Sequence, residues 1–333
     1  MGVLLGVFLI VFVLLIVGLI LSQLFWRKRL KNIQGQHVVI TGGSSGIGKS
    51  FAILAAKNGA NVTIIARDIK KLETAKNEIQ HSCQNKDKQK IEYLSLDVAS
   101  SFENIEKSFN ELEKNSGPIF MLVNCAGKAI GGKIEDSKID DVKFMWNLNF
   151  LGTYQCIKAV VPRMKNSRDG IIIITSSMAA FSGVFGLSAY SSTKFALRGL
   201  AESLKMELNP YNIFVTMALP PDTDTPGFAI EEATKPLETK LISDSCGTFS
   251  PDVVANQMLE DSLAGKFFST VGMEGFLLGF LCAGMSPVCS IGQVILEFLL
   301  MGFCRIIGAC YLATFNNTIK KCMKTRDQNK KCE

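Results

Sequence analysis

A tyrosine and a lysine stand four positions apart in the stretch SAYSSTK, residues 188–194. On a helix this spacing places Tyr190 and Lys194 on one face, close enough for their side chains to touch. Two interpretations follow: a solvent-facing pair on an amphipathic helix, or the acid of an enzyme with an ammonium group beside it. A phenol ordinarily has a pKa of about 10, and a nearby positive charge lowers it toward the range useful for proton exchange. The rest of the chain has to decide between the two.

A glycine-rich turn, TGGSSGIG at 41–48, is the second chemical signal, because it follows an apolar run and precedes a helical pattern. Gly42 permits a tight turn, and Gly46 lets the backbone approach a pyrophosphate. Gly48 allows the helix, which we expect to begin at about Ile47, to pack close to the strand. The free N–H groups of the helix N-terminus then bind the phosphate charge. This position in the first strand–helix unit predicts a dinucleotide site.

The residues after the second apolar run bear on the choice of dinucleotide. Arg67 lies 19 positions after Gly48, where an acidic residue indicates NAD and an arginine accommodates the additional phosphate of NADP. Lys71 can join Arg67, so we expect NADPH. Asp68 keeps NAD open, and a solvated basic face is the plain alternative. The other polar residues expected to contact the cofactor are Ser44 and Ser45, through the same phosphate, and Asp97, through the adenine amino group.

The elements that must position these residues alternate from about Gln36 onward. Short β-rich runs occupy 37–41, 61–66, 91–97, 119–124, 171–176 and 213–218, and 266–272 is a candidate last strand. Helical segments such as 49–59 and 192–208 lie between them. Continuous apolar strands that alternate with helices are typical of a parallel sheet covered on both faces. We therefore predict an α/β fold, a doubly wound parallel sheet of the Rossmann type, in one domain over 36–270.

Five motifs in order carry a family resemblance: TGGSSGIG, NCAG (124–127), NFLG (149–152), TSS (175–177) and YSSTK (190–194). Over about 36–270 the chain resembles the short-chain dehydrogenase/reductase family. The resemblance implies that Tyr190 is the proton donor and Lys194 its activating lysine. It further implies that Ser177 orients the substrate carbonyl, with Ser176 as the fallback, and that Asn149 holds a proton-relay water.

The resemblance also extends the expected cofactor site and bears on assembly. It implies that Asn124, Ala126 and Gly127 line the cofactor together with Tyr190 and Lys194, although an ordinary turn at a strand end is the plain alternative for NCAG. Many family members pair through the helices that carry Asn149 and Tyr190, which leaves a homodimer as an option.

Both ends of the chain are hydrophobic. Residues 1–26 carry no charged side chain and are long enough to span a bilayer, and RKRLK follows at 27–31. A cleaved signal peptide would require a basic residue in front, so we expect an uncleaved anchor with residue 27 onward in the cytosol. For 275–315 we expect a membrane-associated helical hairpin with Pro287 at its turn, followed by a basic cytosolic tail at 316–333. An apolar flap on the membrane surface, or an acyl-chain cover on the domain, stays open.

Composition excludes several classes of protein. Ten cysteines without a C-x-x-C pair, and two histidines, argue against a zinc site and a disulfide framework, so we expect no metal and free thiols in a reducing compartment. The net charge of +6 is modest. Its basic clusters, 27–31 and 320–331, flank apolar segments, so anionic lipid headgroups explain them better than nucleic acid does.

The segment LPPDTDTPGF at 219–228, followed by TKPLETKLIS at 234–243, narrows the substrate. With GGSSGIGK it resembles the branch of the family that reduces a long-chain sphingoid ketone with NADPH at the cytosolic face of the endoplasmic reticulum. Asp222 or Asp224 is a candidate partner for the substrate's ammonium group, and turn or capping roles are the alternative. The competing hypotheses are a membrane-anchored reductase of a steroid, retinoid or fatty acyl carbonyl, and an inactive NADPH-binding scaffold.

Overall fold

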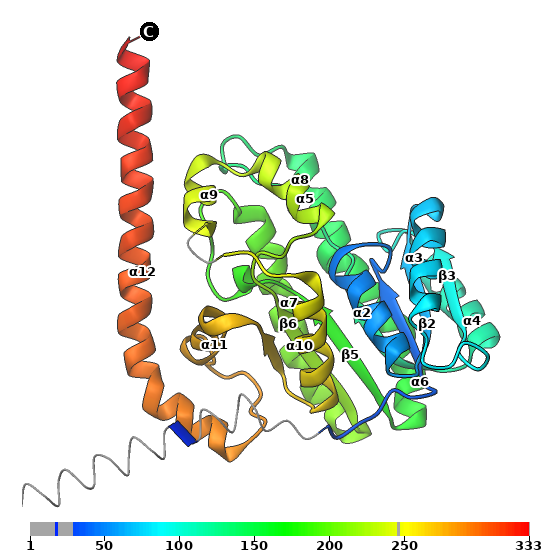
Figure 1. Ribbon diagram of the computed structural model, residues 1–333. Coiled ribbons are helices and arrows are strands. Elements are labelled where there is room, and N and C mark those ends of the chain that lie inside the picture. Colours follow the sequence, from blue (N-terminus) through cyan, green and yellow to red (C-terminus); the bar gives the residue numbers. More distant parts are fainter. Residues whose placement is uncertain (1–16, 19–28, 245–246, 333) are drawn as a thin grey trace, which may run out of the picture.

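The computed structural model describes residues 17–18, 29–244 and 247–332 of the chain, and Figure 1 shows its strands and helices. The strands are β1 (His37–Thr41), β2 (Asn61–Ala66), β3 (Ile91–Ser95), β4 (Ile119–Asn124), β5 (Gly170–Thr175), β6 (Ile213–Leu219) and β7 (Phe268–Thr270). The α-helices are α2 (Gly46–Lys57), α3 (Ile69–His81), α4 (Phe102–Ser116), α5 (Ile139–Met145), α6 (Gly152–Ser167), α7 (Ser188–Leu208), α8 (Pro226–Thr234), α9 (Leu237–Ser243), α10 (Pro251–Leu263), α11 (Gly272–Leu281) and α12 (Ile291–Cys332). The expected anchor at 1–26 lies outside the described residues, apart from Val17 and Gly18.

The seven strands pair in parallel in the order β3-β2-β1-β4-β5-β6-β7. This confirms the predicted doubly wound sheet, and the candidate run at 266–272 supplies β7. From β1 the chain passes through β2 to β3 at one edge of the sheet. It then crosses back to β4 on the other side of β1 and continues toward the opposite edge. Such a reversal opens a crevice at the carboxyl ends of the strands, where ligands of open α/β sheets bind.

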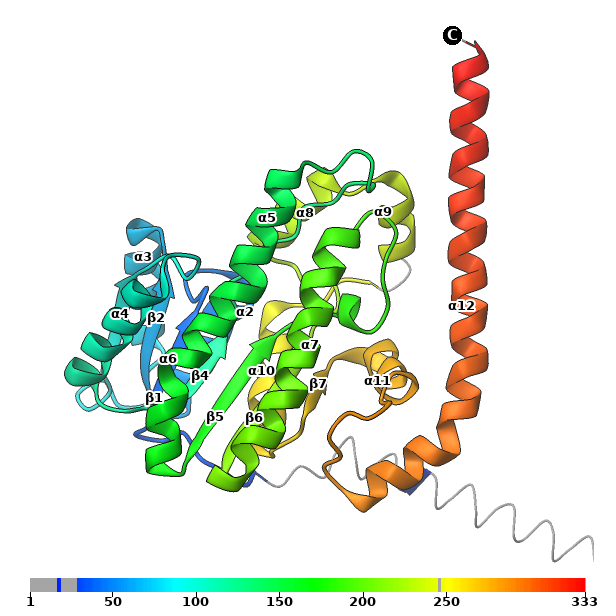
Figure 2. The ribbon, with the colours of Figure 1, turned by 180° about the vertical axis from the view of Figure 1, so that it is seen from behind.

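Helices cover both faces of the sheet, which explains the continuous apolar strands. Every residue of β1 and β4 is buried. On one face α2, α3 and α10 pack through side chains such as Phe51, Leu72 and Met258, and Figure 1 views this layer. On the other face α4, α6 and α7 pack through side chains such as Phe109 and Leu197, and Figure 2 views it from behind. Parallel sheets occur almost only with both faces covered in this way.

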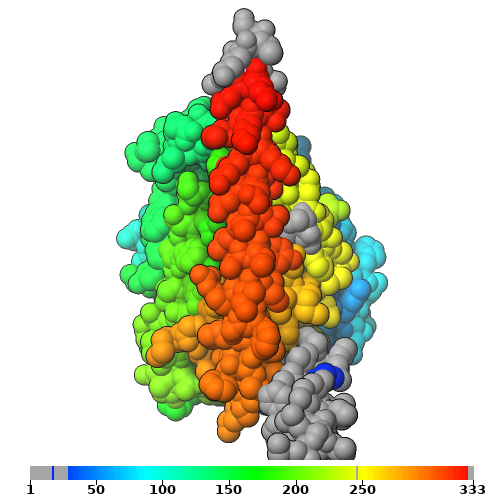
Figure 3. Space-filling view, turned by 90° about the vertical axis from the view of Figure 1, so that its left-hand side faces the viewer, coloured from blue at the N-terminus to red at the C-terminus, as the bar shows by residue number. Residues whose placement is uncertain are grey.

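The C-terminal region consists of a short and a long apolar helix. The short helix, α11, packs on α12, and Phe280, Leu296 and Cys304 are buried between them. The 42-residue α12 runs over one side of the domain (Figure 3) and also contacts α9. Its residues Ile291–Gln328 are long and apolar enough to cross a bilayer, and few of their side chains are buried.

The boundaries in this region differ from the expected hairpin and tail. Pro287 lies in the connection between α11 and α12, where a turn was expected, but the first helix already ends at Leu281. The second helix continues through the expected tail, 316–333, to Cys332. No proline follows Pro287 in the sequence, so nothing in the local backbone ends the helix earlier. Within the tail, Arg326 forms an ion pair with the buried carboxylate of Glu238 on α9.

Two residues of the N-terminal basic cluster form ion pairs with the domain itself. Arg29 forms an ion pair with Glu260 on α10. Lys31 forms an ion pair with Asp169 and lies over the ring of Phe214, with Nζ 4.4 Å from the ring centre. Their charges are therefore used to hold the segment before β1 against the sheet.

Candidate active site

A cavity of about 780 Å³ lies at the carboxyl ends of β4, β5 and β6. The expected catalytic residues Ser177, Tyr190 and Lys194 all line it. Its other walls come from the loop after β4, the loop after β6 with α8, and the helices α11 and α12. The location agrees with the general rule for open α/β sheets. The structure thus brings the serine, the tyrosine and the lysine to one cavity.

Tyr190 and Lys194 occupy successive turns of α7, as their spacing predicted. Lys194 is 5% exposed, so the solvent-facing interpretation of the pair is wrong. Its Nζ lies 5.4 Å from the centre of the Tyr190 ring and donates a 3.1 Å hydrogen bond to the carbonyl oxygen of Thr175. Burial lowers the pKa of Lys194 to about 8. Burial, followed by the negative charge of Glu231, raises the pKa of Tyr190, while a hydrogen bond with Ser177 lowers it.

The two candidate serines have different surroundings. Ser176 is buried, and its hydroxyl donates a 3.1 Å hydrogen bond to the carbonyl oxygen of Lys194. Ser177 begins the short helix η2 (Met178–Ala180), and its hydroxyl oxygen accepts a 3.2 Å hydrogen bond from the backbone N–H of Ala179. That bond uses the oxygen of Ser177 as acceptor and leaves its hydroxyl proton for donation, and the hydrogen bond with Ser177 lowers the pKa of Tyr190. The geometry therefore favours Ser177 over Ser176 as the group that meets a substrate.

Asn149 lies on a single π-helical turn, η1 (Trp146–Leu151), and is fully buried. Its amide nitrogen donates to the carbonyl oxygen of Lys128 at 2.9 Å and to Oγ1 of Thr193 at 3.1 Å. Its amide oxygen accepts a 2.9 Å hydrogen bond from the backbone N–H of Lys128. Asn149 thus clamps the loop after β4 to α7. Such π-turns are rare and frequently mark functional sites.

The glycine-rich turn has the close backbone contacts that were expected of it. Gly42 has φ of +67°, and a Cβ atom there would lie 2.8 Å from the backbone nitrogen of Ala126. A Cβ atom on Gly48 would lie 2.5 Å from the carbonyl oxygen of Gly42. The helix α2 begins at Gly46, one residue before the expected start at Ile47, and Ser45 at its N-cap makes no capping hydrogen bond through its side chain. The turn therefore presents bare backbone, which fits a pyrophosphate.

The basic residues after β2 are exposed. The side chains of Arg67 and Lys71 are 62% and 70% exposed. Arg67 Nη1 lies 3.8 Å from Oδ2 of Asp97, whose other oxygen accepts a hydrogen bond from the backbone of Ala99. Asp68 is the N-cap of α3 and accepts a 3.1 Å hydrogen bond from the backbone N–H of Lys71. Asp68 thus has a structural role as the cap of this helix.

The loop after β4 connects the two halves of the site. Asn124 is buried, and its amide donates a 3.2 Å hydrogen bond to the carbonyl oxygen of Ile173. Within the described part of the chain, its amide oxygen has no hydrogen-bond partner, and neither Asn124 nor Ala126 is among the residues that line the cavity. A Cβ atom on Gly127 would lie 3.3 Å from Oδ1 of Asn149 and 3.7 Å from Nζ of Lys194. This glycine therefore lets the loop pass close to the catalytic residues.

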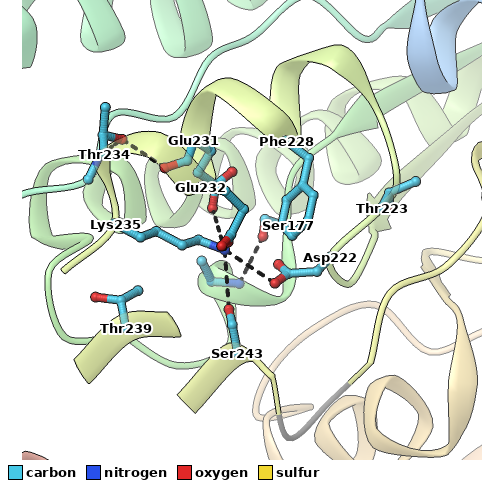
Figure 4. Close-up of polar contacts among 12 residues, drawn as sticks. Ser177, Asp222, Thr223, Phe228, Glu231, Glu232, Thr234, Lys235, Thr239 and Ser243 are labelled. Atoms are coloured by element: carbon cyan, nitrogen blue, oxygen red, sulfur yellow. Dashed lines mark hydrogen bonds and ion pairs between the residues drawn. The ribbon is translucent and has the colours of Figure 1, made fainter. Parts of the chain in front are cut away.

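An ion-pair cluster beside the cavity contains residues that the sequence did not single out (Figure 4). The fully buried Nζ of Lys235 lies 3.2 Å from Oδ2 of Asp222, 3.2 Å from Oε1 of Glu231 and 2.7 Å from Oε1 of Glu232. Of the three acids, Asp222 and Glu231 line the cavity. Asp224, the other candidate from the sequence, is absent from the lining residues described.

One wall of the cavity, contributed by α11 and α12, is mostly apolar. Its apolar side chains are Leu277, Leu278, Leu281, Ile307, Leu312 and Phe315. Tyr311, which also lines it, donates a 3.3 Å hydrogen bond to Oε1 of Glu274. This arrangement is the one that an acyl-chain cover requires. The apolar composition of both helices was visible in the sequence, but their place over the cavity was not.

Comparisons with known proteins agree with this geometry. Residues 36–235 match the family model described as short chain dehydrogenase. The chain is 46% identical over 323 residues to a 3-dehydrosphinganine reductase of Danio rerio, with 97% of this chain and 96% of the relative covered. It is 45% identical over 315 residues to a 3-ketodihydrosphingosine reductase of Bos taurus, with 95% and 94% covered.

Solved structures show the same fold with nicotinamide cofactors bound. A short-chain dehydrogenase from Sphingobium yanoikuyae in complex with NADPH has a TM-score of 0.62 and 25% identity, covering 71% of this chain and 87% of that one. An NAD⁺-bound xylitol dehydrogenase has a TM-score of 0.65 and 22% identity, covering 72% and 99%. The family model and these structures support a nicotinamide cofactor for this chain. The chain belongs to the short-chain dehydrogenase family of oxidoreductases.

Proposed function

We propose that this protein reduces 3-oxosphinganine to sphinganine with NADPH. The observation that carries the proposal is the lining of the cavity, which combines Ser177 and Tyr190 with the apolar wall of α11 and α12. A long-chain ketone has matching chemistry, a single polar head and an extended hydrocarbon tail. The names of the relatives from Danio rerio and Bos taurus support the same substrate.

Each of three residues at the cavity has a separate role in the reduction. When bound, NADPH supplies the hydride that adds to the carbonyl carbon and is itself oxidised. The Ser177 hydroxyl donates a hydrogen bond to the carbonyl oxygen, where negative charge develops. Tyr190 gives its phenolic proton to that oxygen, so the C=O π bond becomes one C–H and one O–H bond. The ammonium of Lys194 stabilises the phenolate that remains.

Asn149 prepares the return of the proton to Tyr190. Its two hydrogen bonds to the Lys128 peptide fix the loop after β4, and both Asn149 and Lys194 approach Gly127. We assign to Asn149 the positioning of a relay water beside Lys194.

Arg67 and Lys71 favour NADPH over NADH. Both are exposed at the carboxyl end of β2, next to the glycine-rich turn after β1, and the carboxylate of Asp68 is occupied by its helix cap. A phosphate on the adenine ribose would meet their charges together with the hydroxyls of Ser44 and Ser45. Two cations at this position suit a dianionic phosphate better than a ribose hydroxyl.

The outer face of α12 suits contact with a membrane. Phe298, Phe303 and Ile306 are 84%, 69% and 66% exposed, while Ile307 and Phe315 on the same helix line the cavity. We place this face on the cytosolic leaflet of the endoplasmic reticulum, with residues 1–26 as an anchor and 36–270 as the catalytic domain. The tail of a membrane-borne substrate then enters the cavity beside α12.

A panel of carbonyls tests the proposed function. The full chain, solubilised in detergent and supplied with NADPH, is given 3-oxosphinganine, retinal, a 3-ketosteroid or a long-chain fatty aldehyde, and the products are identified by mass spectrometry. A reaction without a carbonyl is the control for background NADPH oxidation. We expect kcat/KM for 3-oxosphinganine to exceed the others by at least about tenfold, because both the polar and the apolar residues that line the cavity match it. A higher value for any other carbonyl would reassign the substrate.

A further inference from the structure

Two carboxylates lie in the wall of the catalytic cavity near the proton donor. Asp222 follows β6, Glu231 lies on α8, and both line the same cavity as Ser177 and Tyr190. The negative charge of Glu231 acts on Tyr190, whose pKa it raises, and Asp222 does so more weakly. The reduction as described above uses neither of these acids.

Lys235 holds the two carboxylates in place (Figure 4). Its ammonium group is fully buried, bonds to the hydroxyl of Ser243 at 3.3 Å, and lies 4.6 Å from the centre of the Phe228 ring. Three carboxylates, those of Asp222, Glu231 and Glu232, share this one ammonium. The cluster therefore keeps a net negative charge, and its side chains are fixed before any ligand arrives.

The other charged groups of the cavity belong to different parts of the wall. Lys194 is bound to the Thr175 carbonyl on the side of β5, and Lys128 belongs to the loop after β4. Arg305 and Glu274 belong to the wall formed by α12 and α11. The acids that the β6–α8 segment contributes to the cavity are therefore Asp222 and Glu231, which act on Tyr190 and are available to a cationic substrate group.

We infer that Asp222 and Glu231 bind the ammonium group of the substrate and select an amino ketone over a neutral ketone of the same length. This inference rests on the proposed function. The amine of 3-oxosphinganine is on the carbon next to the carbonyl, so a carbonyl held by Ser177 and Tyr190 brings the ammonium to the same end of the cavity. A ketone without the amine leaves both desolvated carboxylates without a new partner, which is the arrangement that gives strong discrimination.

The experiment compares two ketones and three variants. The ketones are 3-oxosphinganine and its deamino analogue, which has the same chain and hydroxyl group but no amine. The variants are Asp222→Asn, Glu231→Gln and the matched control Glu232→Gln, which also loses a carboxylate from Lys235 but lies outside the lining of the cavity. NADPH affinity, measured by nicotinamide fluorescence, shows whether each variant is folded.

We expect Glu231→Gln and Asp222→Asn each to lower kcat/KM for 3-oxosphinganine by about tenfold to a hundredfold. For the deamino analogue we expect kcat/KM to stay within about twofold, and Glu232→Gln to change neither substrate by more than this. An equal loss on both ketones would overturn the inference, because Glu231 would then act through Tyr190 or through folding. An unchanged preference for the amine in both variants would overturn it as well.

The wild-type protein separates this inference from the proposed function. If wild type binds NADPH but reduces neither ketone, the proposed function fails whatever the variants do. If wild type reduces 3-oxosphinganine and the deamino analogue equally well, the proposed reduction stands and the role of the two carboxylates fails.

Discussion

The carbonyl oxygen of Thr175 accepts a 3.1 Å hydrogen bond from Nζ of Lys194, so the last residue of β5 holds the lysine of α7. Ser177 follows Thr175 by two residues, and Tyr190 precedes Lys194 by one helical turn. One strand end and one helix therefore fix the three proposed catalytic groups relative to each other. Such rigidity suits a reaction in which hydride and proton must arrive at adjacent atoms of one carbonyl.

The buried lysine predicts how the reduction depends on pH. Burial lowers the pKa of Lys194 to about 8, so its ammonium form is present below that pH and is lost as the pH rises through it. Tyr190, whose pKa is raised, keeps its proton over this range. We expect kcat/KM for NADPH, which reports the cofactor-free enzyme, to fall as the pH passes about 8. A profile from pH 6 to 10, with Lys194→Met as the variant that lacks the inflection, checks this. The same inflection in Lys194→Met would assign it to another group.

Arg67 predicts the cofactor preference. Arg67→Ala should weaken NADPH binding by about tenfold to a hundredfold, the loss of a charge-assisted contact to phosphate, and leave NADH binding unchanged. Because the side chain is 62% exposed, folding should not suffer. Lys70→Ala, an exposed cation on α3 outside the expected site, is the matched control. Equal weakening of both cofactors would show that Arg67 does not contact the phosphate that distinguishes them.

Gly48 predicts a steric limit in the glycine-rich turn. A Cβ atom there would meet the Gly42 carbonyl oxygen at 2.5 Å, and backbone cannot move aside cheaply. We expect Gly48→Ala to cost about 1–3 kcal/mol of unfolding free energy and to weaken cofactor binding. The control is Gly199→Ala in α7, where nothing lies within 4 Å and the change should stabilise the helix by about 0.5–1 kcal/mol. Thermal unfolding with and without NADPH measures both, and a neutral Gly48→Ala would contradict the close packing.

The sequence predicted most of the fold because local patterns specify it. The bounds of β1, β2 and β4 agree with the apolar runs at 37–41, 61–66 and 119–124, since each run is buried on both sides and ends in polar or small residues. The cap of α3 was also readable, because an aspartate directly before a helical pattern is a common N-cap, yet Asp68 was weighed only as a cofactor ligand.

Contacts between residues far apart in the chain could not be predicted from the sequence. Lys235 follows Glu231 and Glu232 at helical spacing, which predicts an ion pair but not its place beside Tyr190. Arg29 and Lys31 form ion pairs with Glu260 and Asp169, which lie far away in the sequence. In α12, Glu297 accepts a 2.8 Å hydrogen bond from Gln293, and Arg305 lines the cavity.

A substitution at Gly308 on α12 tests whether the apolar wall of the cavity binds the hydrocarbon tail. It lines the cavity, and a Cβ atom there would lie 2.7 Å from Cδ2 of Leu281. A leucine at this position must displace Leu281 or fill part of the cavity, so Gly308→Leu should reduce kcat/KM for the long-chain ketone by about tenfold and spare analogues with short chains. Gly302→Leu, on the same helix with nothing within 4 Å, is the control. An equal loss of kcat/KM for ketones with short and with long hydrocarbon chains would show that the substrate tail does not bind at this wall.

The central claim is that Tyr190 protonates a long-chain amino ketone reduced by NADPH. The most direct measurement follows NADPH oxidation and sphinganine formation by the detergent-solubilised full chain given 3-oxosphinganine, for wild type and Tyr190→Phe. We predict equal amounts of NADP⁺ and sphinganine from wild type. In the variant we predict kcat to be about a hundredfold to ten-thousandfold lower, with NADPH affinity retained. Sphinganine formed by Tyr190→Phe at the wild-type rate would contradict the account.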